Sequence, residues 1–213
     1  MSDTTHTPEA EIPDDRQLPD EVDALSDGLA ALRDHLVANL DGVTATAFRG
    51  ELTLETTAEH VPQVLAFCKA DPVAACELLS DVSAVHWPAG AAEVNSQETT
   101  GWPTYTEVED SGHIDVSWIL RSVSKSHWFR LRVSLPDDNP VVASATPQYS
   151  SANFLEREVY DLMGVEFTGH PALTRIMMPD DWDGHPHRKD YPLGGVEVMY
   201  KGHTVSPPDE RDY

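Results

Sequence analysis

The sequence predicts an α+β fold of two layers, in which a mostly antiparallel sheet carries helices on one face and is followed by an extended C-terminal arm. Leucines recur at helical spacing between residues 25 and 40, and apolar and polar residues alternate between residues 114 and 135. Beyond Gly164 the chain has several prolines, many charges and no periodicity. Tight hairpins require antiparallel pairing, and amphipathic helices bury their apolar stripe against one face of such a sheet.

The first helix is expected to run from Asp20 to about Gly42, since glycine is common just after a helix end. Its apolar stripe consists of Leu25, Leu29, Leu32, Leu36 and Leu40. A hairpin is expected next, with strands at residues 43–48 and 52–55 around the turn Arg49-Gly50-Glu51.

A second helix is predicted at residues 60–69, with Pro62 in its first turn, where the missing amide costs least. A strand is expected at residues 82–87. The clearest strand signal follows, in which residues 114–124 and 128–135 form a hairpin through a tight turn. A short strand at residues 141–145 precedes the last helix.

The last helix starts at Ser150 or Ser151, both suitable N-caps, and ends before Gly164. Its buried stripe is expected to be Leu155, Val159, Leu162 and Met163. The charged residues Glu156, Arg157, Glu158 and Asp161 are expected to project elsewhere. Arg157 and Asp161, four residues apart, are predicted to pair.

Three parts of the chain follow from this pattern. Residues 1–19 are acidic and contain prolines, which predicts a disordered tail. Residues 20–168 form the α+β domain, with a long polar loop at residues 88–112 that is interpreted as an insertion. Residues 169–213 are predicted to be an arm that binds a partner.

Composition excludes several classes of protein. The formal net charge of −23 argues against nucleic acid and anionic lipid as direct partners. No apolar run is long enough to span a membrane, and the N-terminus does not look like a signal peptide, so a cytoplasmic location is expected. Cys68 and Cys76 are expected to be reduced and buried, and they do not supply the four thiolates of an iron–sulfur cluster.

The sequence contains few residues in an arrangement that would support catalysis. Glu156 and Glu158 are two apart on a helix, so their carboxylates diverge and do not converge on one substrate atom. A metal site could use histidines and aspartates of the arm, but no third ligand lies at a recognised zinc spacing. These candidates are His170, His185, His187, Asp180, Asp181 and Asp183. Neither a nucleophile elbow nor a dinucleotide fingerprint is present.

Residues 153–192 read NFLEREVYDLMGVEFTGHPALTRIMMPDDWDGHPHRKDYP. The helical ERE motif, the GHP motifs and the RKDYP ending closely resemble the C subunit of proton-translocating NADH–quinone oxidoreductase, respiratory complex I. Two features depart from that family. His187 stands where leucine is usual, and the loop at residues 88–112 is longer.

The resemblance implies a scaffold subunit of the peripheral arm, on the cytoplasmic side of the cell membrane. It implies no cofactor on this chain, because FMN, the iron–sulfur clusters and quinone would belong to partner subunits. The main partner would be the D subunit of the complex, with the B subunit nearby. Two alternatives remain open: the equivalent subunit of a related membrane-bound hydrogenase complex, and a free-standing metal-dependent enzyme.

The predicted subunit interface combines the charged helix with the arm. In this interpretation Arg188, Lys189 and Asp190 form charge pairs across the interface, and Trp182 and Tyr191 are large anchors of the kind enriched at hot spots. The full set is Glu156, Arg157, Glu158, Asp161, His170, Arg175, Trp182, Arg188, Lys189, Asp190 and Tyr191.

Overall fold

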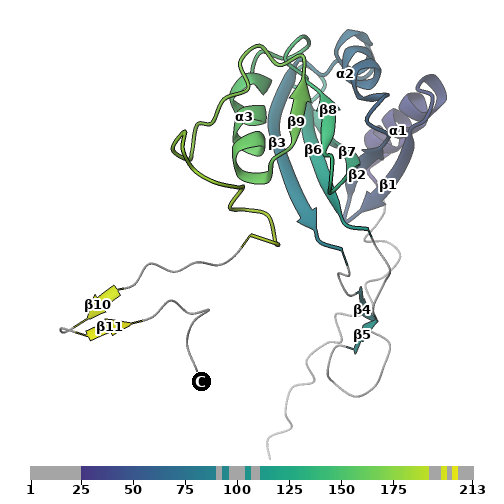
Figure 1. The fold of residues 1–213 in the computed structure, drawn as a ribbon. Coiled ribbons are helices and arrows are strands. Elements are labelled where there is room, and N and C mark those ends of the chain that lie inside the picture. Colours follow the sequence, from purple (N-terminus) through teal and green to yellow (C-terminus); the bar gives the residue numbers. More distant parts are fainter. Residues whose placement is uncertain are drawn as a thin grey trace, which may run out of the picture.

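A five-stranded sheet in the order β1-β2-β7-β6-β3 forms the centre of the molecule (Figure 1). Its strands are β1 (Thr44–Phe48), β2 (Glu51–Glu55), β3 (Leu78–Trp87), β6 (His113–Ser122) and β7 (His127–Pro136). Within this sheet β2 and β7 pair in parallel, and the other neighbouring strands pair antiparallel. The computed structural model describes residues 25–89, 93–95, 104–106, 111–191, 198–200 and 203–205.

Within the described residues, the second layer consists of the helices α1 (Asp27–Asn39), α2 (Val61–Ala70) and α3 (Ala152–Met163) (Figure 1). Two short strands, β8 (Val141–Ala143) and β9 (Glu166–Thr168), pair in parallel beside them. The predicted α+β class, with a mostly antiparallel sheet, is therefore confirmed. No helix within the described ranges is long and apolar enough to cross a bilayer.

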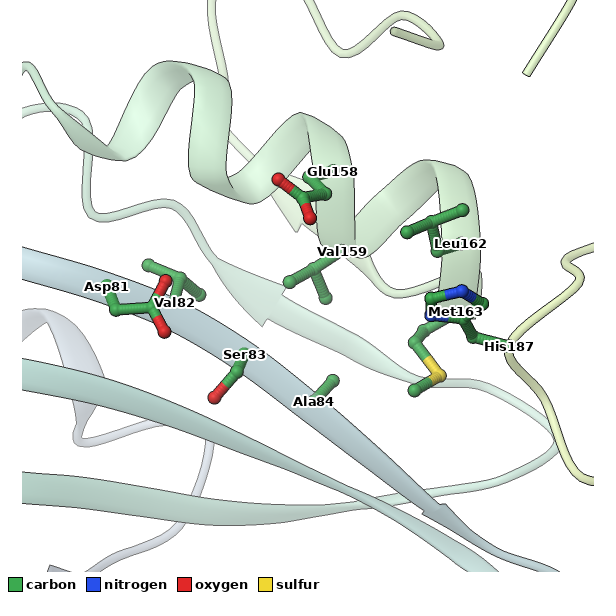
Figure 2. Close-up of a pocket in the computed structure, with 9 residues that line it drawn as sticks. All are labelled: Asp81, Val82, Ser83, Ala84, Glu158, Val159, Leu162, Met163 and His187. Atoms are coloured by element: carbon green, nitrogen blue, oxygen red, sulfur yellow. The ribbon is translucent and has the colours of Figure 1, made fainter. Parts of the chain in front are cut away.

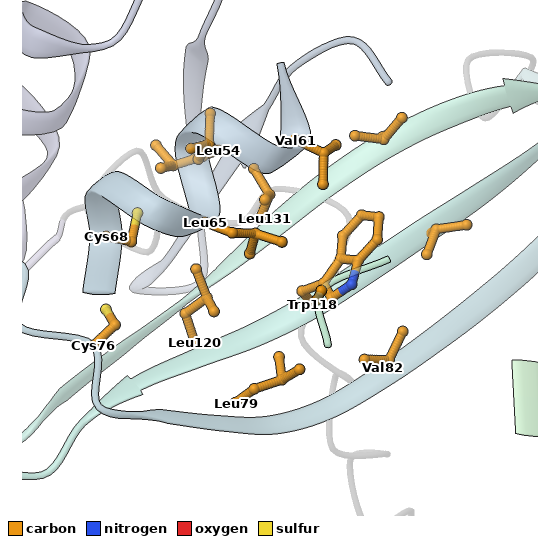
Figure 3. Packing of buried hydrophobic residues seen from close by; sticks show 14 of the residues in the cluster. Leu54, Val61, Leu65, Cys68, Cys76, Leu79, Val82, Trp118, Leu120 and Leu131 are labelled. Carbon is orange, nitrogen blue, oxygen red and sulfur yellow. The ribbon is translucent and has the colours of Figure 1, made fainter. Parts of the chain in front are cut away.

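The core lies between the sheet and the helices. Alternate residues of β6 and β7 point into it, and Trp118, Leu120 and Leu131 are fully buried there (Figure 3). Val61 and Leu65 of α2 cover these side chains. Fully burying a large apolar side chain contributes roughly 1.5–3 kcal/mol, so the contact between these layers favours folding strongly.

Both cysteines lie in this core as free thiols, as predicted. Cys76 donates a hydrogen bond from its Sγ to the carbonyl of Ala74. Burial is the main cause that raises the pKa of Cys76, to about 12. Since thiolates are the reactive form, both groups act as packing residues.

Some boundaries differ from the prediction. Helix α1 starts at Asp27 rather than Asp20, because Ser26 is its N-cap and accepts a hydrogen bond from the Leu29 amide. Strand β3 begins at Leu78, four residues earlier than expected, and has an irregularity between Leu79 and Asp81 that breaks its alternation.

The predicted loop at residues 88–112 contains two paired strands, β4 (Glu93–Asn95) and β5 (Thr104–Thr106). The predicted disordered tail, residues 1–19, lies outside the described residues. Of the predicted arm, the structure describes residues 169–191 and the paired strands β10 (Val198–Tyr200) and β11 (His203–Val205).

Ser151 takes the N-cap position of α3, as expected, but its side chain does not cap the helix. Its hydroxyl instead donates to the carbonyl of Leu79 and ties α3 to strand β3. Gly164 ends the helix with a φ of 81°, in the left-handed region that favours glycine.

Candidate functional site: the strap along α3

Residues 170–191 form a segment that we call the strap. It leaves the end of β9, follows the outer side of α3 and returns below that helix (Figure 1). Its side chains and amides bond repeatedly to α3 and to β3. Residues 170–191 of the predicted arm therefore lie along their own domain.

Asp161 of α3 holds the middle of the strap. Its carboxylate accepts hydrogen bonds from the amides of Ile176, Met177 and Met178 at 2.7–2.9 Å. It also accepts one from Nη1 of Arg175 at 2.6 Å. The Asp161 side chain is fully buried, and burial alone would raise its pKa; the hydrogen bonds outweigh this and lower the pKa to about 2.

Two arginines brace the same turn of the strap. Arg157 donates from Nε to the carbonyl of Thr174 at 3.0 Å and from Nη2 to the carbonyl of Arg175 at 3.2 Å. Arg175 donates from Nη2 to the carbonyl of Gly184 at 3.0 Å. The predicted pair between Arg157 and Asp161 is therefore wrong, because each side chain bonds to the strap instead.

Glu156 is buried on the opposite side of α3. Its carboxylate accepts a hydrogen bond from the hydroxyl of Ser144 and another from the amide of Ala145, both at 2.6 Å. Burial is the largest effect and raises the pKa of Glu156, against the lowering effect of these bonds. The expectation that the four charged residues of α3 project away from the core is wrong for Glu156 and Asp161, which are fully buried.

The histidines of the strap serve as structural hydrogen-bonding groups. His170 bonds through Nε2 to the carbonyl of Asn153, and His185 bonds through Nδ1 to the carbonyl of Asp161. The amide of His187 donates to the carbonyl of Leu162 at 3.0 Å. These contacts fix the strap at both ends of α3.

The last turn of the strap meets strand β3 at a second cluster of charges. Arg188 binds both Asp137 and Asp190. The amide of Lys189 donates to Nδ1 of the buried His86 at 2.8 Å. The structure thus shows Arg188 and Asp190 paired with each other, within the chain.

His86, Asp137 and Asp190 could in principle hold a metal ion, since their ligand atoms lie within 4.8 Å of one another. Nδ1 of His86 accepts the Lys189 amide, so the ring proton belongs on Nε2, which lies 3.1 Å from Asp137. A metal bound at Nε2 would move that proton to Nδ1, where it would face the proton of the Lys189 amide. The metal would also compete with Arg188 for the carboxylate of Asp137. The cluster therefore suits an ionic contact better than a metal.

Sequence reasoning missed His86 and Asp137, which are far from the strap along the chain and carry no motif. The histidines and aspartates proposed for a metal site in the arm do not form a group of potential ligands within the described residues. Several predicted interface residues do face outward: Trp182 is 41% exposed, and Glu158 and Lys189 are exposed too. Tyr191 is half-buried and donates from its hydroxyl to the carbonyl of Asp183. Their role at an interface stays a prediction.

Comparison with known proteins agrees with the resemblance. Residues 54–197 match the family described as respiratory-chain NADH dehydrogenase, 30 Kd subunit. The NADH-quinone oxidoreductase C subunit of Acidothermus cellulolyticus is 44% identical over 163 residues, which are 76% of this chain and 75% of that protein. The protein of the same name from a Nocardioides species is 38% identical over 202 residues, 94% of this chain and 73% of that protein.

A solved structure of an archaeal respiratory membrane complex, the membrane-bound sulfane sulfur reductase, contains a chain of the same fold. The TM-score is 0.59 at 20% identity, over 77% of this chain and 85% of that chain. Together, the family match over most of the chain and the two bacterial relatives show that this protein belongs to the family of the 30 kDa subunit of respiratory-chain NADH dehydrogenase.

Proposed function

We propose that this chain is a non-catalytic structural subunit of the peripheral arm of NADH–quinone oxidoreductase. It supports electron transfer from NADH through FMN and iron–sulfur clusters to quinone, coupled to proton translocation, while the cofactors belong to partner subunits. In this proposal the D subunit is the main partner, the B subunit lies nearby, and the chain sits on the cytoplasmic side of the membrane.

The observation that supports this proposal is that most charged groups of α3 bind other segments of the same chain. The carboxylate of Asp161 and the guanidinium of Arg157, both on α3, bond to the strap, and Arg175 of the strap binds Asp161 in return. Glu156 bonds to the loop that follows β8. Groups engaged in holding one backbone are unavailable to a substrate, and the result is a preformed surface of the kind that assembly requires.

Deletion and complementation test this function. The full chain with an affinity tag is returned to a strain that lacks it, and membranes are extracted in mild detergent. We expect the D and B subunits to co-purify, and NADH–quinone activity to return with the tagged chain. Activity in the deletion strain at the wild-type level would overturn the proposal, and co-elution of a nickel-binding large subunit would favour the related hydrogenase.

A further inference from the structure

A groove lies between α3 and β3, and the strap reaches it only at one end, through His187. It is lined by Asp81, Val82, Ser83 and Ala84 from β3, and by Glu158, Val159, Leu162 and Met163 from α3 (Figure 2). His187 of the strap and Met163 close one end, as Figure 2 shows. The groove has an apolar floor and two carboxylates on opposite walls.

The two carboxylates have no partner among the described residues. Asp81 and Glu158 are exposed, and neither makes a hydrogen bond or an ion pair with the part of the chain that the structure describes. This sets Glu158 apart from Glu156 and Asp161 of the same helix, whose carboxylates are fully engaged. No lysine or arginine is among the described residues that line the groove.

The size of the groove limits what it holds. Its volume is about 180 Å³. Pockets for cofactors and drug-sized ligands have roughly 300–1,000 Å³, so the groove suits a single side chain. A metal ion fits poorly, since no described His, Cys, Asp or Glu joins these two carboxylates in a trio whose ligand atoms lie within 4.8 Å.

We propose that this groove receives a basic side chain, arginine or lysine, from a neighbouring subunit of the complex. The methylene stem lies on Val82, Val159 and Leu162, and the cationic head is held between Asp81 and Glu158. Long basic side chains bury their stems on apolar surface in this way while the charge remains paired. The inference rests on the proposed function, because it gives the chemistry of the partner that the assembly brings to this chain.

The strap gives the groove its fixed shape. The amide of His187 is bonded to the carbonyl of Leu162 at 3.0 Å. His187 is therefore held at the end of the groove by a bond within this chain. A basic side chain enters a preformed groove at lower entropic cost than one that must order the strap first.

The test uses the full tagged chain in its own membranes. The double variant Asp81→Asn/Glu158→Gln removes both charges with little change of shape. The matched control is Glu59→Gln/Asp138→Asn, which removes two exposed carboxylates that have no partner among the described residues. A second variant, Ser83→Arg, supplies the groove with a guanidinium of its own. Co-purification of the other subunits is measured at low and at physiological ionic strength.

We expect the double variant and Ser83→Arg to retain about a tenth of the wild-type co-purification, with less dependence on salt than the wild type, while the control matches the wild type. Thermal melting of the four purified chains should be the same. If the wild type co-purifies its partners and the double variant does so equally well, the groove inference is overturned and the proposed function stands. If even the wild type recovers no subunit of the oxidoreductase, both are overturned.

Discussion

Replacement of Asp161 by asparagine is the sharpest test of how the strap is held. The substitution keeps the shape of the side chain but removes the charge that three consecutive strap amides and Arg175 share. The asparagine amide group can also point an N–H toward these donors. We expect the strap to open from α3 more often while the sheet and its core remain folded, because the strap contributes little to that core.

The magnitude follows from the pKa of Asp161. A carboxyl whose pKa falls from 3.8 to about 2 on folding stabilises the folded state by roughly 2 kcal/mol at neutral pH. The unpaired Arg175, only 15% exposed, adds to the loss. Because a depressed pKa gives stability that is present above the unfolded value and is lost as pH falls, the variant and the wild type should differ fully above about pH 4 and converge near pH 2.

Limited trypsin digestion of the full chain measures this opening. A loss of about 2 kcal/mol raises the open population roughly 30-fold. Cleavage after Arg175 should therefore be about 30-fold faster in Asp161→Asn, if opening and closing are fast relative to cleavage. The control is Glu158→Gln, an exposed neighbour on the same helix, which should be cleaved at the wild-type rate. Equal rates for Asp161→Asn and wild type would refute the role of Asp161 in holding the strap.

The other predictions concern the buried face and the C-terminal end of α3, and a glycine of α1. Because burial raises the pKa of Glu156, its charge opposes folding, and the stability of the wild type should fall as pH rises from about 4 toward that raised pKa. Glu156→Gln should remove this pH dependence and lower the free energy of unfolding by under about 1 kcal/mol. Urea unfolding at pH 5 and pH 8 measures both effects. Gly164→Ala should lower the free energy of unfolding by about 1–2 kcal/mol, because its Cβ would lie 2.7 Å from His185 and φ is positive. In Gly28→Ala of α1 the added Cβ would meet nothing within 4 Å, so this variant should instead raise the free energy of unfolding by about 0.5–1 kcal/mol. Thermal unfolding should show a lower melting temperature for Gly164→Ala and a higher one for Gly28→Ala.

Local patterns in the sequence predicted most of the fold. The alternation of β6 and β7 and the turn at Arg49-Gly50 depend on neighbours in the chain, so the hairpins were recovered. The position of Asp161 could not be inferred in this way. It lies away from the apolar stripe of α3 and is buried only because residues 176–178, about 15 positions later, fold over it. The arm has no periodicity from which such a return could be predicted.

Glu156 is a different case, because the sequence did contain its signal. Ala152, Glu156 and Val159 stand at i, i+4 and i+7, so the carboxylate falls on the buried stripe itself. A charge at that position requires donors in the core, and Ser144 with the amide of Ala145 supplies them. The position of a charged residue relative to the apolar stripe therefore predicts its direction better than its charge does.

The ERE motif divides its charges among three directions. Glu156 points into the domain, Arg157 bonds to the strap, and Glu158 is left exposed in the groove beside β3. Glu156 and Arg157 already have their partners within this chain, whereas an exposed carboxylate without a partner gains most from a cation brought by another subunit. If the motif acts in assembly, Glu158→Gln should reduce co-purification of partner subunits without altering the trypsin resistance of the strap, and Asp161→Asn should alter both. A Glu158→Gln chain that assembles normally while the Asp161→Asn chain does not would show that assembly depends on the strap and not on Glu158.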